Sequence, residues 1–185
     1  MASTNDIRPG QTLDIDGTLF TILQYQHVKP GKGKAFVRTK LRNLTTGGVV
    51  DKTFRADEQV ELAVLDKREM QFLYSDDAGL VFMDQESYEQ VHLDPEILGD
   101  SGKFLKDGTV VMVPTHEGRP VGAEMPITIE LEITQTEPGA KGDRVSGALK
   151  PATVETGAVV QVPLFLEQGE KIKIDTRTGE YISRA

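Results

Sequence analysis

The sequence predicts an all-β protein built from three consecutive small β-barrels. Its dominant hydrophobic period is two, which is the period of a strand with one buried face. Turn signals such as Asp16-Gly17 and Thr178-Gly179 separate short apolar segments along the whole chain. Helix signals are nearly absent. The 185 residues suffice for one to three small domains.

The first barrel is expected over residues 1–63. Alternation in Thr12–Ile15 predicts a strand, and the Asp16-Gly17 pair predicts a hairpin turn after it. The turn Thr45-Thr46-Gly47-Gly48 precedes the last strand of this block. The segments expected to be strands are 12–15, 19–28, 35–44 and 49–54.

The second barrel is expected over residues 64–126 and the third over residues 127–185. Asp94-Pro95 predicts the start of one short helix, with Asp as N-cap and Pro at the first helical position. Gly99 and Gly102 predict its early end. No long flexible linker separates the blocks, so we expect a fixed, elongated arrangement. The remaining expected strands are 69–74, 80–83, 89–93, 109–114, 127–133, 159–166, 171–175 and 179–182.

Composition excludes several classes of protein. The chain has no cysteine, which excludes disulfides, thiolate metal sites and cysteine nucleophiles. Its histidines, His27, His92 and His116, are scattered singly, without the spacing of a zinc site. No catalytic constellation is evident, so we expect neither an enzyme, a metal nor a cofactor. The chain lacks a secretion signal and any run of the roughly 20 apolar residues that a membrane helix needs, so we expect a cytoplasmic protein that binds no membrane.

The net charge of −8 is unevenly distributed. Residues 1–63 carry nine bases and seven acids, whereas residues 64–126 carry five bases and thirteen acids. From Gly17 to Val50 there is no carboxylate. The bases in that window are Lys29, Lys32, Lys34, Arg38, Lys40 and Arg42. A local basic field of this kind favours contact with phosphates, whatever the total charge.

Lys32 is the most informative residue of this window. Pro30-Gly31 and Gly33 supply the backbone freedom of a tight turn, and leave Lys32 at its tip between two residues without side chains. Strands of about eight residues would hold it about 26 Å along a hairpin. A nucleotide-binding P-loop is excluded because Gly33-Lys34 is followed by Ala35, with the wrong spacing. A solvated hairpin without a role and a hairpin that contacts RNA both fit the loop by itself.

Three regions of the chain carry its most distinctive motifs: the loop Val28–Phe36, the segment Lys150–Phe165 and the ending Asp175–Tyr181. These regions resemble bacterial translation elongation factor P. Lys150–Phe165 fits the C-terminal signature of that family through Gly169, and the middle segments 72–74 and 81–84 also fit. The resemblance covers the whole chain in order.

The resemblance implies a KOW-like or SH3-like first domain followed by two OB-type domains, in an L-shaped outline similar to tRNA. It implies a monomer that binds the 70S ribosome between the peptidyl and exit sites, contacts rRNA and peptidyl-tRNA, and relieves stalling at consecutive prolines by stimulating peptide-bond formation. Lys32 would lie beside the acceptor end of the tRNA, framed by Pro30, Gly31, Gly33 and Lys34, and would be the target of a lysine-modifying enzyme.

The sequence departs from the family pattern at two places. Lys34 stands where the β-lysylated family members have glutamine, which leaves the modifying enzyme open. Gly142-Asp143-Arg144 matches a Gly-Asp-Thr loop implicated in contact with the mRNA, except that Arg144 replaces threonine. Tyr181 and Arg184 are further candidates for ribosome contact, with a strand-packing tyrosine and a solvated arginine as the alternative.

The rival function is general RNA binding by OB-type barrels. Such proteins stack bases on clustered aromatic side chains, and the basic window holds only Phe20, Tyr25 and Phe36. A paralogous family shares the C-terminal signature but lacks the loop of Lys32. The hypusine-bearing relatives have two domains. The third domain expected at residues 127–185 therefore argues against membership of that group. Lys29, Arg38, Lys40 and Arg42 remain the candidate RNA-binding residues under either function.

Overall fold

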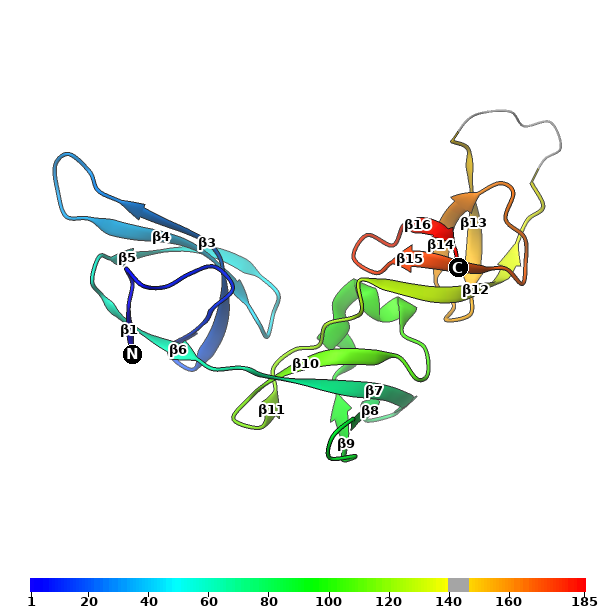
Figure 1. The fold of residues 1–185 in the computed structure, drawn as a ribbon, viewed down its shortest axis with the longest axis horizontal. Coiled ribbons are helices and arrows are strands. Elements are labelled where there is room, and N and C mark those ends of the chain that lie inside the picture. The colour runs from blue at the N-terminus through cyan, green and yellow to red at the C-terminus, as the bar shows by residue number, and fades with distance from the viewer. Residues whose placement is uncertain (140–146) are drawn as a thin grey trace. The chain divides into compact units, whose positions relative to one another are not determined.

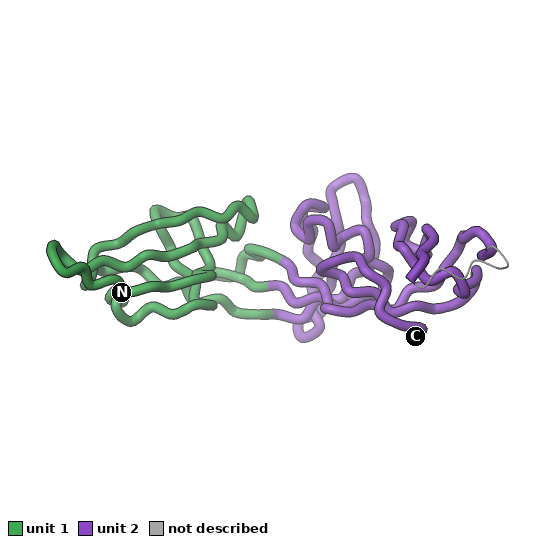
Figure 2. The backbone as a smooth tube through the Cα atoms, turned by 90° about the horizontal axis from the view of Figure 1, so that it is seen from above, with its two compact units in different colours: residues 1–67, 114–122 green, residues 68–113, 123–185 purple. Residues whose placement is uncertain are grey.

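The computed structural model describes residues 1–139 and 147–185, and it confirms the all-β prediction (Figure 1). Three antiparallel sheets follow one another along the chain. Contacts divide the chain into two compact units (Figure 2). The first comprises residues 1–67 and 114–122, and the second comprises residues 68–113 and 123–185. No helix of the described residues is long and apolar enough to cross a membrane.

The N-terminal sheet has six strands in the order β1-β6-β2-β3-β4-β5. The predicted Asp16-Gly17 turn joins β2 to β3, and both residues adopt the positive φ that this hairpin turn requires, 53° and 84°. Its core contains Ile7, Leu13, Ile22, Val37, Leu41, Phe54 and Val60. The strands are β1 (Ala2–Ser3), β2 (Thr12–Ile15), β3 (Thr18–Val28), β4 (Phe36–Asn43), β5 (Val49–Arg55) and β6 (Gln59–Ala63).

The β3–β4 hairpin is the longest ladder of this sheet. Its pairing runs from Phe20 opposite Asn43 to Val28 opposite Phe36, with an irregularity between Ile22 and Gln24. Strand β5 then pairs with β4 over its whole length. The hairpin is therefore supported on one side up to its last paired residues, and its connecting loop begins only at residue 29.

The middle sheet has five strands in the order β11-β10-β7-β8-β9. The predicted cap is confirmed: the Asp94 carboxylate accepts a 2.8 Å bond from the Glu96 amide. The element η1 (Pro95–Phe104) consists of two short 3₁₀ segments, because Gly99 adopts a non-helical conformation between them, with φ 59° and ψ −144°. The predicted end of the first helix at Gly99 is therefore confirmed, and the second segment places Phe104 in a buried position. The strands are β7 (Asp66–Asp76), β8 (Gly79–Asp84), β9 (Gln90–Leu93), β10 (Val110–His116) and β11 (Arg119–Pro120).

The C-terminal sheet has five strands in the order β14-β13-β12-β15-β16. Strand β13 was not predicted. Its buried side is Lys150, Ala152 and Val154, so a lysine occupies a core-facing position and hides the alternation that predicts a strand. The strands are β12 (Thr128–Thr136), β13 (Leu149–Val154), β14 (Val159–Pro163), β15 (Lys171–Asp175) and β16 (Tyr181–Arg184).

The middle and C-terminal sheets share contacts within the second unit. Phe104 of η1 is 1% exposed and belongs to the core of the C-terminal sheet. The Thr156 hydroxyl donates a 2.7 Å bond to the Lys103 carbonyl, and Lys106 Nζ donates a 3.1 Å bond to the Glu130 carbonyl. The end of η1 thus joins the two sheets by packing and by hydrogen bonds.

Candidate nucleic-acid interface

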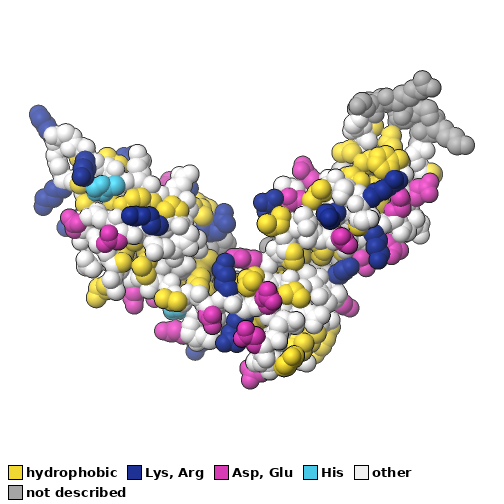
Figure 3. All heavy atoms as spheres, viewed as in Figure 1, with side chains coloured by type: hydrophobic (Ala, Val, Ile, Leu, Met, Phe, Trp, Pro, Cys, Tyr) yellow, Lys and Arg dark blue, Asp and Glu magenta, His cyan; other side chains and the backbone are white. Residues whose placement is uncertain are grey.

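The loop between β3 and β4 presents a cluster of lysines to solvent. Residues 29–34 are all exposed, and Lys32 lies in the middle of the bend. In the described part of the chain, the structure shows no hydrogen bond or ion pair of the Lys29, Lys32 or Lys34 side chains. Lys and Arg side chains gather at this end of the hairpin (Figure 3). Each ammonium has three N–H donors, which are therefore available to an anion.

The two glycines beside Lys32 differ in backbone conformation. Gly33 has a φ of 106°, a region that residues with a side chain rarely adopt. A Cβ built on it would lie 3.9 Å from Pro30 Cγ, which is an ordinary contact. Gly31 has no such φ, and a Cβ there would meet open space. The conformation of the loop thus depends on Gly33 more than on Gly31.

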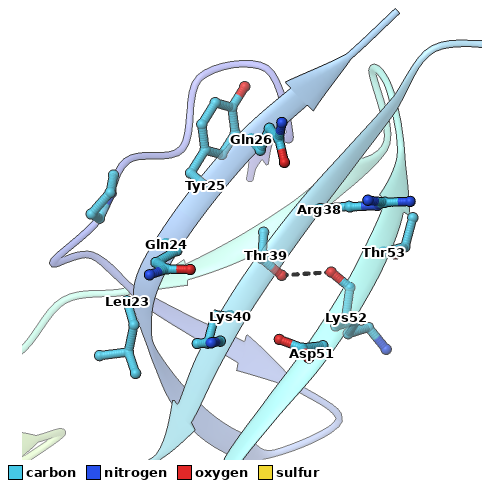
Figure 4. A pocket seen from close by; sticks show the side chains of 11 residues that line it. Leu23, Gln24, Tyr25, Gln26, Arg38, Thr39, Lys40, Asp51, Lys52 and Thr53 are labelled. Carbon is cyan, nitrogen blue, oxygen red and sulfur yellow. Dashed lines mark hydrogen bonds between the residues drawn. The ribbon is translucent and has the colours of Figure 1, made fainter. Parts of the chain in front are cut away.

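A basic surface lies next to this loop on β3, β4 and β5. Pairing places Gln24, Lys40 and Asp51 in one row, and Gln26, Arg38 and Thr53 in the next. These six residues share one face of the sheet, because alternate residues of a strand point to the same side. They line a shallow hollow of about 810 Å³ (Figure 4).

Three of the four candidate RNA-binding residues are brought together on this surface. Arg38 and Lys40 line the hollow, and Arg42 follows at the next position of β4 on the same face. Lys29 lies instead on the loop with Lys32. The hairpin thus carries a continuous series of cations from Arg42 to the loop.

Gln24, Gln26 and Asp51 also belong to this surface, although the sequence patterns did not single them out. Lys52 alternates with Asp51 and Thr53 and pairs with Thr39, so its side chain lies on the other face. The pairing of β4 with β5 sets Asp51 opposite Lys40. The surface therefore contains one carboxylate, although the window from Gly17 to Val50 has none. The alternation in 49–54 could have shown which residues share a face, but the pairing partner depends on the strand register.

Aromatic side chains near the surface are already covered by cations. The Arg38 guanidinium lies 5.3 Å from the centre of the Phe36 ring, and Arg8 lies 5.8 Å from that of Tyr25. Both rings are only partly exposed. Base stacking is therefore a minor mode of contact here, and the surface is suited to binding phosphates through charge.

The candidate residues of the C-terminal sheet lie in the other unit. Gly142, Asp143 and Arg144 lie outside the described residues. Tyr181 packs against the core of its sheet. Arg184 is held by Glu170, with 3.2 Å between Nη2 and Oε1, and its guanidinium lies 4.8 Å from the centre of the Phe165 ring.

Nothing in the geometry of the described residues indicates a metal or a catalytic group. Within residues 1–139 and 147–185, no three His, Asp or Glu side chains gather in a way that could hold a metal ion. Asp76 of the Asp76-Asp77 turn pairs with His92 at 3.0 Å, and the hydrogen bond from His92 holds the pKa of Asp76 below its ordinary value. This pair is exposed and lies on the middle sheet, so it serves as a surface contact.

Comparison with protein families assigns each part of the chain. Residues 3–60 match the model "Elongation factor P (EF-P) KOW-like domain" and residues 65–123 match "Elongation factor P (EF-P) OB domain". Residues 129–184 match "Elongation factor P, C-terminal". The fold and the exposed basic loop therefore belong to a translation factor of KOW-like and OB-type domains, which is a non-catalytic class of protein.

Relatives cover the chain from end to end. "Elongation factor P" of Acidothermus cellulolyticus is 55% identical over 185 residues, which is 100% of this chain and 99% of the relative. "Elongation factor P" of Moorella thermoacetica is 53% identical over 185 residues, covering 100% of both. The chain belongs to the elongation factor P family.

Among solved structures, the fold is similar to "Eukaryotic translation initiation factor 5A from Methanococcus jannaschii". The TM-score is 0.56 at 23% identity, over 68% of this chain and 92% of that chain. A translation initiation factor eIF-5A family protein from Naegleria fowleri gives a TM-score of 0.52 at 15% identity, over 67% of this chain and 96% of that one. Both show a shared fold.

Proposed function

We propose that this translation factor binds the ribosome between the peptidyl and exit sites and sets Lys32 beside the acceptor end of peptidyl-tRNA. There it stimulates peptide-bond formation and relieves stalling at consecutive prolines. The observation that carries the proposal is the solvent-exposed Lys32 at the end of the β3–β4 hairpin, next to the basic surface of Arg38, Lys40 and Arg42.

A lysine can do this without entering the reaction. The proline ring restricts φ and the conformation of the preceding residue, so a chain ending in prolines holds the peptidyl-tRNA in a poor geometry for attack. Restoring the alignment of two reactants can recover much of the rate without a new catalytic group. The Lys32 ammonium contacts backbone phosphates at the acceptor end, while the basic surface contacts phosphates farther along the tRNA or rRNA.

The exposure of Lys32 also suits enzymatic modification. Its side chain is free in the described structure, and Gly31 and Gly33 leave room for another protein to approach. A modification that lengthens the side chain extends its reach to the tRNA. The proposed partners are the 70S ribosome, rRNA, peptidyl-tRNA and a lysine-modifying enzyme.

A reconstituted bacterial translation system lacking this factor tests the proposal. The rate of synthesis of a Pro-Pro-Pro peptide is compared with that of a proline-free peptide, using native protein, Lys32→Ala and the control Lys171→Ala, an exposed lysine of the C-terminal sheet. We expect native protein and Lys171→Ala to accelerate only the proline peptide, and Lys32→Ala to lose most of the effect.

Two other results would change the assignment. Full acceleration by Lys32→Ala would show that the protein has the proposed function but that Lys32 has no role in it. No proline-selective effect from protein purified from its own organism would favour a general RNA-binding protein.

A further inference from the structure

A second cavity opens on the C-terminal sheet, within the second unit. It has a volume of about 510 Å³ and lies between the segment that follows β12 and the segment that follows β14. A Cβ built on Gly139 would lie 2.6 Å from the Leu164 carbonyl oxygen, so the two walls are in backbone contact. This contact keeps the walls together and gives the cavity a definite shape.

The cavity contains a buried cation. Lys150 is 6% exposed and lines it from β13. Its Nζ donates a 2.5 Å hydrogen bond to the Glu137 carbonyl. In the described chain no carboxylate makes an ion pair with it. An ammonium has three donors, and a buried charge is costly unless it is paired. The remaining capacity of Lys150 fits an anion.

The rim of the cavity carries an aromatic ring. Phe165 is 59% exposed, and the Arg184 guanidinium covers one face of its ring at 4.8 Å. Exposed hydrophobic side chains are visible on this part of the molecule (Figure 3). Phe165 differs from Phe36 and Tyr25, which are only partly exposed, because most of its side chain remains open to solvent beside the cation. An exposed ring beside a cation is an arrangement with which proteins bind a nucleotide of a single strand.

We propose that this cavity binds one phosphate-bearing nucleotide of single-stranded RNA, with the phosphate on Lys150 Nζ and the base against Phe165. Glu137 and Glu167 are exposed at the rim and repel a second phosphate, so the cavity holds one nucleotide and does not follow a longer backbone. The inference rests on the proposed function in one respect: a factor that binds the ribosome is surrounded by RNA.

The test uses the full-length protein labelled with ¹⁵N and the single-stranded probe hexaadenylate, with inorganic phosphate as a second probe. Hexaadenylate is expected to shift the amide resonances of Gly139, Phe165 and Gln168 in the wild-type protein. Because this measurement needs no substitution, it does not depend on the folding of a variant. Inorganic phosphate at the same concentration should shift them much less.

Affinity for hexaadenylate is then compared between Lys150→Met and Lys171→Met, an exposed lysine on β15 of the same sheet. Losing a charge-assisted bond weakens binding about tenfold, and the salt dependence of log K should fall by about 0.7 for Lys150→Met. Lys171→Met should change affinity less than about twofold. Thermal melting of each variant verifies that it is folded.

Three results would overturn the inference. The first is that hexaadenylate shifts only amide resonances of β3–β5 in the wild-type protein. The second is that the two lysine variants lose affinity for hexaadenylate equally. The third is that inorganic phosphate shifts the same resonances as strongly as hexaadenylate, which would indicate an anion site without nucleotide recognition. The two proposals are tested by separate measurements. Absence of hexaadenylate binding at this cavity would leave proline-selective acceleration unaffected, and absence of that acceleration would leave hexaadenylate binding unaffected.

Discussion

Phe104 and Gly179 are in contact across the second unit: a Cβ built on Gly179 would lie 3.5 Å from Cζ of the Phe104 ring. Phe104 ends the helix of the middle sheet, and Gly179 lies in the turn between β15 and β16. The ring is 1% exposed and fills the core of the C-terminal sheet. One side chain therefore couples the stability of the two sheets.

Replacing Phe104 by Ala should destabilise the second unit by about 3–5 kcal/mol, because it removes a large buried ring and leaves a cavity. Urea unfolding followed by the circular dichroism of the full chain measures the change. Tyr88→Ala is the matched control, since Tyr88 is 71% exposed and its loss should cost less than about 0.5 kcal/mol. Equal unfolding midpoints for the two variants would contradict the shared core.

Gly33→Ala should weaken proline-selective acceleration, while Gly31→Ala should leave it nearly unchanged. A side chain at a φ of 106° strains the loop by about 1 kcal/mol or more and shifts Lys32 from its position. Gly31 has open space and no such φ. The Pro-Pro-Pro synthesis rate measures both variants. If both glycine variants lose activity equally, the loop conformation described here is not the active one.

The basic surface of β3–β5 should contribute separable phosphate contacts to ribosome binding. Arg38→Gln and Lys40→Gln should each lower the slope of log K against log salt by about 0.7–0.9. Asp51→Asn should raise affinity, because it removes the carboxylate opposite Lys40. Binding of each variant to 70S ribosomes over a salt series measures the slope. Arg119→Gln, an exposed base outside the hollow, is the control and should leave it unchanged.

Asp175 should show an acid-shifted titration that depends on Arg177. The Arg177 side chain lies 2.9 Å from the carboxylate and lowers the pKa of Asp175 from 3.8 to about 2. Because the folded-state pKa lies below the unfolded value, the contribution of this carboxylate to stability is complete above about pH 4. It is lost as the pH falls through about 2.

Arg177→Gln should bring the pKa of Asp175 back toward 3.8, and NMR titration of the side-chain carboxyl carbon measures this directly. The loss of stability that Asp175 causes in the wild type between pH 4 and pH 2 should disappear in this variant, because the folded and unfolded pKa values of Asp175 then agree. Lys173→Gln, which also removes a base from this hairpin, should leave the Asp175 titration in place. An unchanged pKa in Arg177→Gln would show that other groups cause the shift.

Local signals in the chain predicted most of the strands and the main candidate residue. The Asp16-Gly17 turn, the Asp94 cap and the exposed position of Lys32 all follow from residues close together in the sequence. Strand β13 escaped prediction because Lys150 faces inward where an apolar residue is expected. The first helical segment ends at Gly99 as predicted, and a second short segment that buries Phe104 follows it.

By itself the sequence determined the all-β class, the turns that separate the strands and the lysine at the hairpin tip, since each depends on hydrophobic period or backbone preference over a few residues. Only the tertiary structure decided that Asp51 faces Lys40, that Phe104 fills the C-terminal core and that Lys150 lies in a cavity beside Phe165. These relationships join residues distant in the chain. They depend on strand register and on how apolar surfaces are buried together, which no local pattern encodes.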